Sequence, residues 1–227
     1  MSPKVRRLAW AWWPALLVMA LAVTGYFVLL DAVTEQDDLW VLDEPLLEWF
    51  AAHREPWLTA VMATISWIFG PVVLPILVAI GGAFWGVRTG QWFNVGVVVG
   101  SMALAGILAL LLKLAVDRPR PPDEFWLVPD GVSTASFPSG HTLCATTLVL
   151  VTGYLAWRTE RSVKVLVGWA LASAVVMALV ALSRLYLGYH FLTDVLAGAC
   201  VGVFVLGVVI GVVRSHDGPR RAAAAPR

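Results

Sequence analysis

The chain has 227 residues, of which 59% are hydrophobic and only 14% are charged, and its formal net charge is +1. A typical soluble domain is about 25% charged, so this composition excludes an ordinary soluble protein and indicates an integral membrane protein. The small net charge excludes nucleic-acid binding driven by bulk positive charge, and no nucleic-acid partner is expected.

Six continuous apolar segments predict an all-α protein, a single membrane domain over residues 1–227 built as a bundle of six transmembrane helices. In chain order the predicted spans are residues 8–30, 57–87, 93–116, 141–157, 165–187 and 191–213. Each is close to the ~20 residues that an α-helix needs to cross the hydrocarbon. The second span contains Pro71 and Pro75, and we expect it to be kinked or tilted.

Two segments outside the spans have their own predictions. Residues 31–56 form a connector whose apolar side chains recur at helical spacing. This pattern fits an amphipathic helix lying in the membrane interface, and it fits equally a connector packed over the bundle. Residues 215–227 are rich in Ala, Pro and Arg, and we expect a disordered cytoplasmic tail.

The basic residues predict the orientation in the membrane. With six spans both termini lie on one side, and that side carries 11 of the 16 Lys and Arg residues. The positive-inside rule therefore places both termini in the cytoplasm. Four of the five remaining basic residues lie at the ends of the third and fifth spans, where charge opposes the topology signal and indicates function.

Three segments contain the residues capable of chemistry, namely 113–121, 137–141 and 183–194. They end the third span, begin the fourth, end the fifth and begin the sixth. A six-span topology therefore places all three segments on the outer face. Span counting alone predicts that residues separated by 80 positions of sequence converge there.

Three fixed cations, Lys113, Arg120 and Arg184, repel one another unless an anion lies between them. Phosphate suits this arrangement because the forked donors of arginine match phosphate oxygens. Ser139 and Gly140 directly precede an apolar run, so their backbone N–H groups and the Ser139 hydroxyl can form an anion site at a helix N-terminus. Singly, these residues also fit structural roles as interfacial anchors or turn residues.

His190 and Asp194 are four residues apart at the start of a predicted helix, so their side chains share a face. A carboxylate there can hold one ring nitrogen and leave the other free to attack. His141 is a second imidazole, able to protonate a leaving oxygen. A structural His–Asp pair and metal ligation by all three side chains are the alternatives. Because the cations repel a divalent ion, we expect no metal and no other cofactor.

The three segments together resemble the signature of the type 2 phosphatidic-acid phosphatase superfamily. The resemblance rests on Lys113-x6-Arg120-Pro121, Pro138-Ser139-Gly140-His141 and Ser183-Arg184-x5-His190-x3-Asp194. It implies that His190 is the nucleophile and forms a phosphohistidine, that Asp194 orients it, and that His141 protonates the leaving group. It also implies that hydrolysis needs no metal and that the phosphate is held by Lys113, Arg120, Ser139, Gly140 and Arg184.

The resemblance implies a lipid phosphatase in the cell (plasma or inner) membrane, with its active site facing outward. On that face a polyprenyl pyrophosphate such as undecaprenyl pyrophosphate is the substrate we favour, followed by phosphatidate, diacylglycerol pyrophosphate and phosphatidylglycerophosphate. A lipid phosphotransferase of the same superfamily is one alternative. A non-enzymatic transporter of anionic lipids is another, but it predicts charges deeper within the spans. The sequence does not indicate an oligomeric state.

Overall fold

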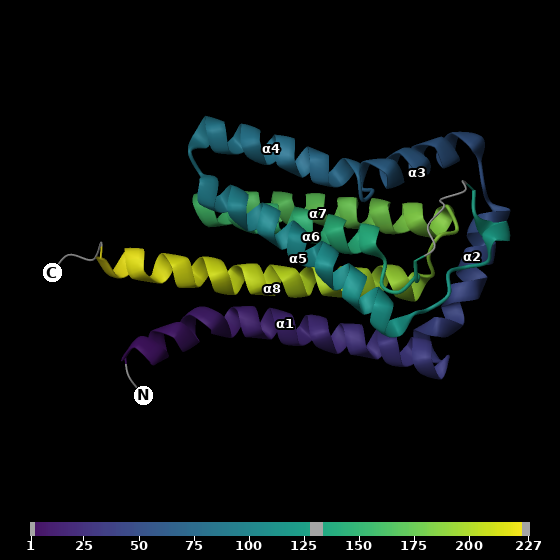
Figure 1. Ribbon diagram of the computed structural model, residues 1–227, viewed down its shortest axis with the longest axis horizontal. Helices are drawn as coiled ribbons and strands as arrows, with labels where there is room; N and C mark the ends of the chain where they lie inside the picture. Colours follow the sequence, from purple (N-terminus) through teal and green to yellow (C-terminus); the bar gives the residue numbers. More distant parts are fainter. Residues whose placement is uncertain (1–2, 128–133, 224–227) are drawn as a thin grey trace.

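The computed structural model describes residues 3–127 and 134–223, and within these ranges every regular element is a helix (Figure 1). The predicted all-α class is therefore confirmed. The long helices are α1 (Pro3–Glu35), α3 (Pro56–Ile68), α4 (Val73–Thr89), α5 (Trp92–Val116), α6 (Gly140–Glu160), α7 (Val163–Tyr186) and α8 (Leu192–Ala223). The short ones are η1 (Asp38–Leu42), α2 (Asp43–Ala52) and η2 (Asp123–Phe125).

The long helices lie side by side along one axis, and α2 crosses one end of the bundle (Figure 1). Helix α1 begins and α8 ends at the opposite end. Helix α6 is central, since it packs against α5, α7 and α8, while α1 lies along α8. Near the α2 end, α1, α5, α6 and α8 share an apolar core that includes Tyr26, Leu29, Ala105, Phe137, Leu143, Ala197 and Val201.

The length and composition of the helices describe a multi-span membrane protein. Four helical segments in the described ranges can cross a membrane, namely 12–35, 92–116, 163–186 and 192–217, and α3 with α4 makes a fifth if the bent pair counts as one span. Large apolar side chains on their outward faces are exposed, among them Leu111 and Leu171, as expected for surfaces that contact lipid.

Two of the predicted spans differ from simple apolar helices. The second is broken between Ile68 and Val73, and its two halves meet at 58°; Pro71, which lies in the break, has no N–H to continue a helix. Residues 141–157 lie within α6, which is helical as expected but less apolar because it contains Thr142, Thr146, Thr147 and Thr152. Six spans therefore stay a prediction.

Two glycines of α8 bring this helix into close contact with α6. A Cβ placed on Gly198 would lie only 2.5 Å from the Ser139 carbonyl oxygen, and one on Gly202 only 2.6 Å from the Thr146 side chain. Small residues four apart on one helix face allow two backbones to approach in this way. The beginnings of α6 and α8 are thereby fixed against each other.

The connector and the C-terminal segment are more ordered than their sequences suggest. Over residues 31–56 the chain completes α1 and forms η1 and α2. Leu47 is buried whereas Leu42 and Trp49 are exposed, so one side of the connector packs on the bundle, and its place in the membrane interface stays a prediction. The prediction of a disordered tail from residue 215 is wrong for 215–223, because α8 continues to Ala223. Residues 224–227 lie outside the described ranges.

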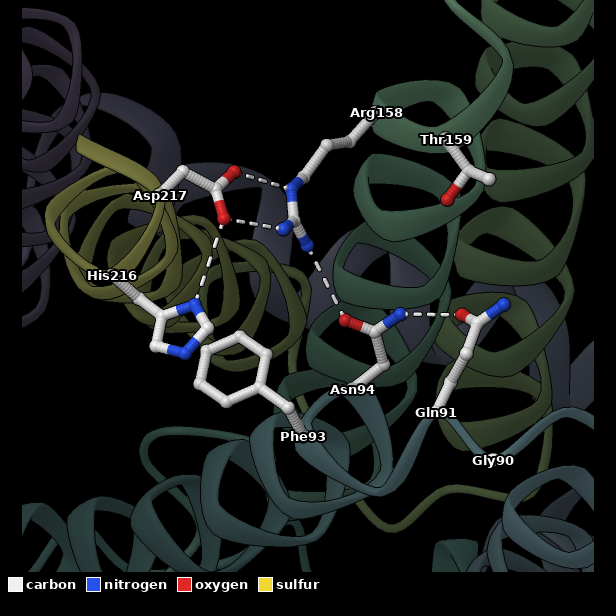
Figure 2. A pocket seen from close by; sticks show the side chains of 8 residues that line it. All are labelled: Gly90, Gln91, Phe93, Asn94, Arg158, Thr159, His216 and Asp217. Atoms are coloured by element: carbon white, nitrogen blue, oxygen red, sulfur yellow. Dashed lines mark hydrogen bonds and ion pairs between the residues drawn. The ribbon is translucent and has the colours of Figure 1, made fainter. Parts of the chain in front are cut away.

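A polar cluster joins α5, α6 and α8 near the C-terminal end of α6, away from α2 (Figure 1). Figure 2 shows its side chains. The cluster lines an open hollow of about 520 Å³. Arg158 donates to both Asp217 carboxylate oxygens at 2.7 and 2.9 Å and to the Asn94 side-chain oxygen at 3.3 Å. The ring of His216 stacks on Phe93 with centroids 3.8 Å apart. These contacts explain why α8 remains helical beyond residue 214.

Candidate active site

The three motif segments meet at the α2 end of the bundle (Figure 1). Lys113 lies in the last turn of α5, His141 in the first turn of α6, and Arg184 in the last turn of α7. His190 lies between α7 and α8, and Asp194 lies in the first turn of α8. The structure therefore brings together residues that the sequence separates by 80 positions.

His190 is buried and held by Asp194. Its Nδ1 lies 3.2 Å from Asp194 Oδ2, which also accepts the Phe191 N–H at 2.9 Å. Burial lowers the pKa of His190 well below its usual value, and the neighbouring positive charges, Arg184 first among them, lower it further. The imidazole is therefore neutral at pH 7, so Nδ1–H donates to the carboxylate and Nε2 keeps its lone pair.

His141 lies against the break between α3 and α4. A Cβ placed on Gly70 would be 3.7 Å from His141 Nε2, so the absence of a side chain at Gly70 leaves room beside this imidazole. The sequence predicts a kink in this span from Pro71 and Pro75, but it does not predict that the kink borders the site.

Lys113 and Arg120 both bind carbonyl oxygens of the segment that precedes α6. Lys113 Nζ donates to the carbonyls of Ala135 and Ser136, the latter at 3.3 Å. Arg120 Nε donates to the Thr134 carbonyl at 2.8 Å. These contacts place two of the predicted phosphate-binding cations on one side of the site.

Arg184 is the third cation and is almost completely buried, with 1% of its surface exposed. Its Nη1 donates to the Ser66 hydroxyl of α3, and its guanidinium carbon lies 4.4 Å above the Tyr189 ring. Burial of an arginine is costly unless its charge and donors find partners. The Ser66 hydroxyl and the Tyr189 ring are two such partners, and they hold the Arg184 guanidinium in place. The contribution of Ser66 was not predicted, because α3 is over 100 residues away in sequence.

Ser139 and Gly140 lie at the N-terminus of α6, as expected, but one donor is used differently. The Ser139 N–H donates to the Asp194 carbonyl at 2.9 Å, and the binding of phosphate by Ser139 stays a prediction that depends on its hydroxyl. The Ser139 hydroxyl accepts from Thr142 Oγ1 at 3.2 Å. Gly140 is the first residue of α6, where helix N–H groups are available to an anion.

Two buried charged residues at the site were missed by the sequence reasoning. Arg118 donates to Asp194 Oδ1 and to Asp43 Oδ2, both at 2.8 Å. Asp43, at the start of α2, also accepts the Thr193 N–H at 2.9 Å and the Thr193 hydroxyl at 2.6 Å. Arg118 could have been considered a site residue because it lies inside the motif segment 113–121. Asp43 could not be singled out, because it is one of many acidic residues in the connector.

Metal ligation was the alternative for His141, His190 and Asp194. Within residues 3–127 and 134–223, no group of three or more His, Cys, Asp or Glu side chains is arranged to hold a metal ion. Asp194 instead contacts Arg118, the Phe191 N–H and His190. The described geometry is that of an oriented imidazole surrounded by cations.

The chain is similar in sequence to a known protein superfamily and to two lipid phosphatases. Residues 94–216 match the PAP2 superfamily. The chain is 32% identical over 195 residues to phosphatidylglycerophosphatase B of Bacillus subtilis (strain 168), which covers 82% of this chain and 90% of that protein. It is 35% identical over 94 residues to lipid phosphate phosphatase delta of Arabidopsis thaliana, covering 39% and 22% of the two chains.

Two crystal structures share the fold. The transmembrane PAP2 type phosphatidylglycerolphosphate phosphatase from Bacillus subtilis superposes with a TM-score of 0.76 at 27% identity, covering 87% of this chain and 96% of that one. Aquifex aeolicus LpxE superposes with a TM-score of 0.55 at 23% identity, covering 77% and 95%. The chain therefore belongs to the PAP2 superfamily and is a membrane lipid phosphatase of that family.

Proposed function

We propose that the protein hydrolyses the terminal phosphate of a membrane lipid through a phosphohistidine formed on His190. The observation that carries this proposal is the buried His190–Asp194 contact of 3.2 Å within a group of cations. The carboxylate accepts a hydrogen bond from Nδ1–H, which leaves Nε2 without a proton, so Nε2 is the nucleophilic atom. Cations around it stabilise charge on the phosphoryl oxygens in the transition state.

The charges of the site match those of a phosphate monoester. Six buried or half-buried charged side chains gather there, namely Lys113, Arg118, Arg120, Arg184, Asp43 and Asp194. Among these six side chains, four positive and two negative charges leave a net charge of +2. A phosphate monoester carries about −1.5 to −2 near pH 7, so the bound substrate neutralises the site.

The reaction has two steps. In the first, His190 Nε2 attacks phosphorus, the bond from phosphorus to the lipid oxygen breaks, and protonated His141 gives its proton to that oxygen and becomes neutral. In the second, water attacks the phosphohistidine, His141 takes a proton from the water, and phosphate leaves with His190 restored. The three phosphate-binding cations, together with Ser139 and Gly140, hold the phosphoryl oxygens, and neither step needs a metal ion.

The proposed topology has six spans, cytoplasmic termini and an active site on the outer face of the cell membrane. It is supported by 11 of 16 basic residues on the side of the termini. It is also supported by the arrangement in Figure 1, where α1 begins and α8 ends opposite the α2 end that carries the site.

Phosphatidylglycerophosphate is the first substrate to test, because the Bacillus subtilis relatives are named for it. Undecaprenyl pyrophosphate, which the sequence reasoning favoured, is the second, and phosphatidate and diacylglycerol pyrophosphate complete the panel. All four present a terminal phosphate to the same charged site, so their lipid portions must decide the preference.

The experiment is phosphate release by the detergent-purified protein from each lipid, with and without EDTA. We expect His190→Ala to abolish release and EDTA to leave it unchanged. His53→Ala is the matched control, since His53 is an exposed imidazole of the connector, and it should retain full activity. Release that survives His190→Ala would refute the phosphohistidine mechanism, and loss in EDTA would refute metal independence.

A further inference from the structure

Asp43 binds two elements of the site at once. It is the first residue of α2, only 2% exposed, and its carboxylate accepts hydrogen bonds from Arg118 and from both the N–H and the hydroxyl of Thr193. Thr193 lies in the first turn of α8, where backbone N–H groups lack partners within the helix. Asp43 therefore caps α8 from a different helix, 150 residues away in the sequence.

Arg118 connects this carboxylate to the second one. One of its terminal nitrogens donates to Asp43 at 2.8 Å, and the other donates to Asp194 at 2.8 Å and to the Thr193 hydroxyl at 2.7 Å. The guanidinium carbon also lies 4.4 Å above the Phe191 ring. A planar guanidinium held at two carboxylates and against a ring has one orientation, which lysine cannot reproduce.

The network acts on the nucleophile through Asp194. One oxygen of Asp194 contacts His190, and the other accepts from Arg118. Rotation of the carboxylate would break both contacts together, so fixing one oxygen fixes the other. A group of this kind holds an imidazole in the tautomer and orientation that catalysis needs.

We infer that Asp43, acting through Arg118, is a positioning residue for the His190–Asp194 pair. The connector helix α2 therefore contributes a residue on which the orientation of the nucleophile depends. The inference rests on the proposed function, because it takes His190 to be the nucleophile. Neither residue touches the reacting atoms, so their effect falls on the rate of the chemical step and not on lipid binding.

The test compares Asp43→Asn, Arg118→Lys and Thr193→Val by their kcat and KM in the phosphate-release assay. Asp43→Asn removes a charge at constant shape, and Thr193→Val removes the shared hydroxyl while keeping the N–H. We expect kcat to fall about 10- to 100-fold, as for other groups that orient a reactive imidazole, with KM within about twofold. Glu44→Gln is the matched control, because it removes an exposed acidic charge from the same turn of α2.

A second measurement separates positioning from a general loss of structure. In an Asp194→Asn background, Asp43→Asn should lower the remaining kcat no further, because its path to His190 is already broken. A purely structural residue would lower kcat by the same factor in both backgrounds. If a variant at Asp43 or Arg118 fails to fold, Thr193→Val decides the question by the same comparison.

The outcomes distinguish the two proposals. If His190→Ala is inactive and kcat of the Asp43, Arg118 and Thr193 variants stays within twofold of the wild type, the positioning role is refuted and the proposed function stands. Equal additional losses in both backgrounds also refute it. If His190→Ala remains active, the proposed function itself fails.

Discussion

The contact between α8 and the start of α6 can be tested with one added methyl group. In Gly198→Ala, the new Cβ would lie 2.5 Å from the Ser139 carbonyl oxygen and 3.3 Å from the Leu143 nitrogen. Both neighbours are backbone atoms, so no side chain can rotate away. Ordinary contact begins at 3.4 Å, and the two helices must therefore separate locally by about 0.9 Å, the difference between 3.4 and 2.5 Å.

This separation acts directly on the candidate site. The Ser139 N–H donates to the Asp194 carbonyl at 2.9 Å, and a shift of this size would break that hydrogen bond and move His141 relative to His190. A misplacement of about 1 Å costs about 100-fold in rate. Forcing a methyl group into a packed contact also costs about 1–3 kcal/mol of stability. We therefore expect kcat to fall about 100-fold with a lower thermal midpoint.

Phosphate release and thermal unfolding in the same detergent measure both effects. Gly106→Ala is the control, because a Cβ placed on this α5 glycine meets no atom within 4 Å. It should keep its activity and gain up to about 1 kcal/mol, since alanine restricts the unfolded chain. If Gly198→Ala keeps kcat within twofold and an unchanged midpoint, α8 does not approach the start of α6 as the structure describes.

The site and the distant polar cluster lead to four further predictions. Burial and nearby cations lower the pKa of His190. In the pH profile of kcat/KM, the fall in activity toward acid should therefore be centred below pH 6.5, the usual imidazole pKa. A fall centred above pH 6.5 would contradict a neutral nucleophile. The unfolded state binds this proton more readily, so the free energy of unfolding should decrease as pH falls below 6.5. His141→Ala should reduce hydrolysis of phosphatidylglycerophosphate about 100-fold or more, because its alkoxide leaving group needs a proton. The loss of activity on undecaprenyl pyrophosphate should be smaller, because its leaving phosphate has a pKa of about 6. Equal losses on the two lipids would exclude His141 as the acid. Arg158→Ala should lower stability by about 1 kcal/mol without changing kcat, because Arg158 contacts Asp217 and Asn94 from the last turn of α6, whereas His141 lies in the first turn of the same helix. A loss of kcat would contradict this separation.

The apolar runs allowed most helices to be predicted from the sequence. The predicted span 93–116 is observed as α5 from Trp92 to Val116, and 165–187 as α7 from Val163 to Tyr186. These limits are predictable because hydrocarbon excludes charge, so Lys113 and Arg184 can lie only near the ends of the spans. The expected end of helical structure before residue 215 was wrong, because tertiary contacts of Asp217 and His216 stabilise a longer α8.

The parts of the site that were missed depend on long-range contacts. Ser66 lies 118 residues from Arg184 and Asp43 lies 75 residues from Arg118, the arginines that they contact, and neither belongs to a motif. Asp43 lies in a connector with several other acidic residues, among them Asp38 and Glu44. Periodicity assigns all of them to a polar surface, and only the fold shows that Asp43 is buried.

The two buried carboxylates also explain how so many cations can be held together. Lys113, Arg120 and Arg184 lie near His190 and repel one another, and Arg118 adds a fourth positive charge beside them. Asp194 alone would leave a net charge of +3, whereas Asp43 reduces it to +2, the charge that a phosphate dianion neutralises. Because Asp43 belongs to α2, the connector completes the charge balance of the site as well as its geometry.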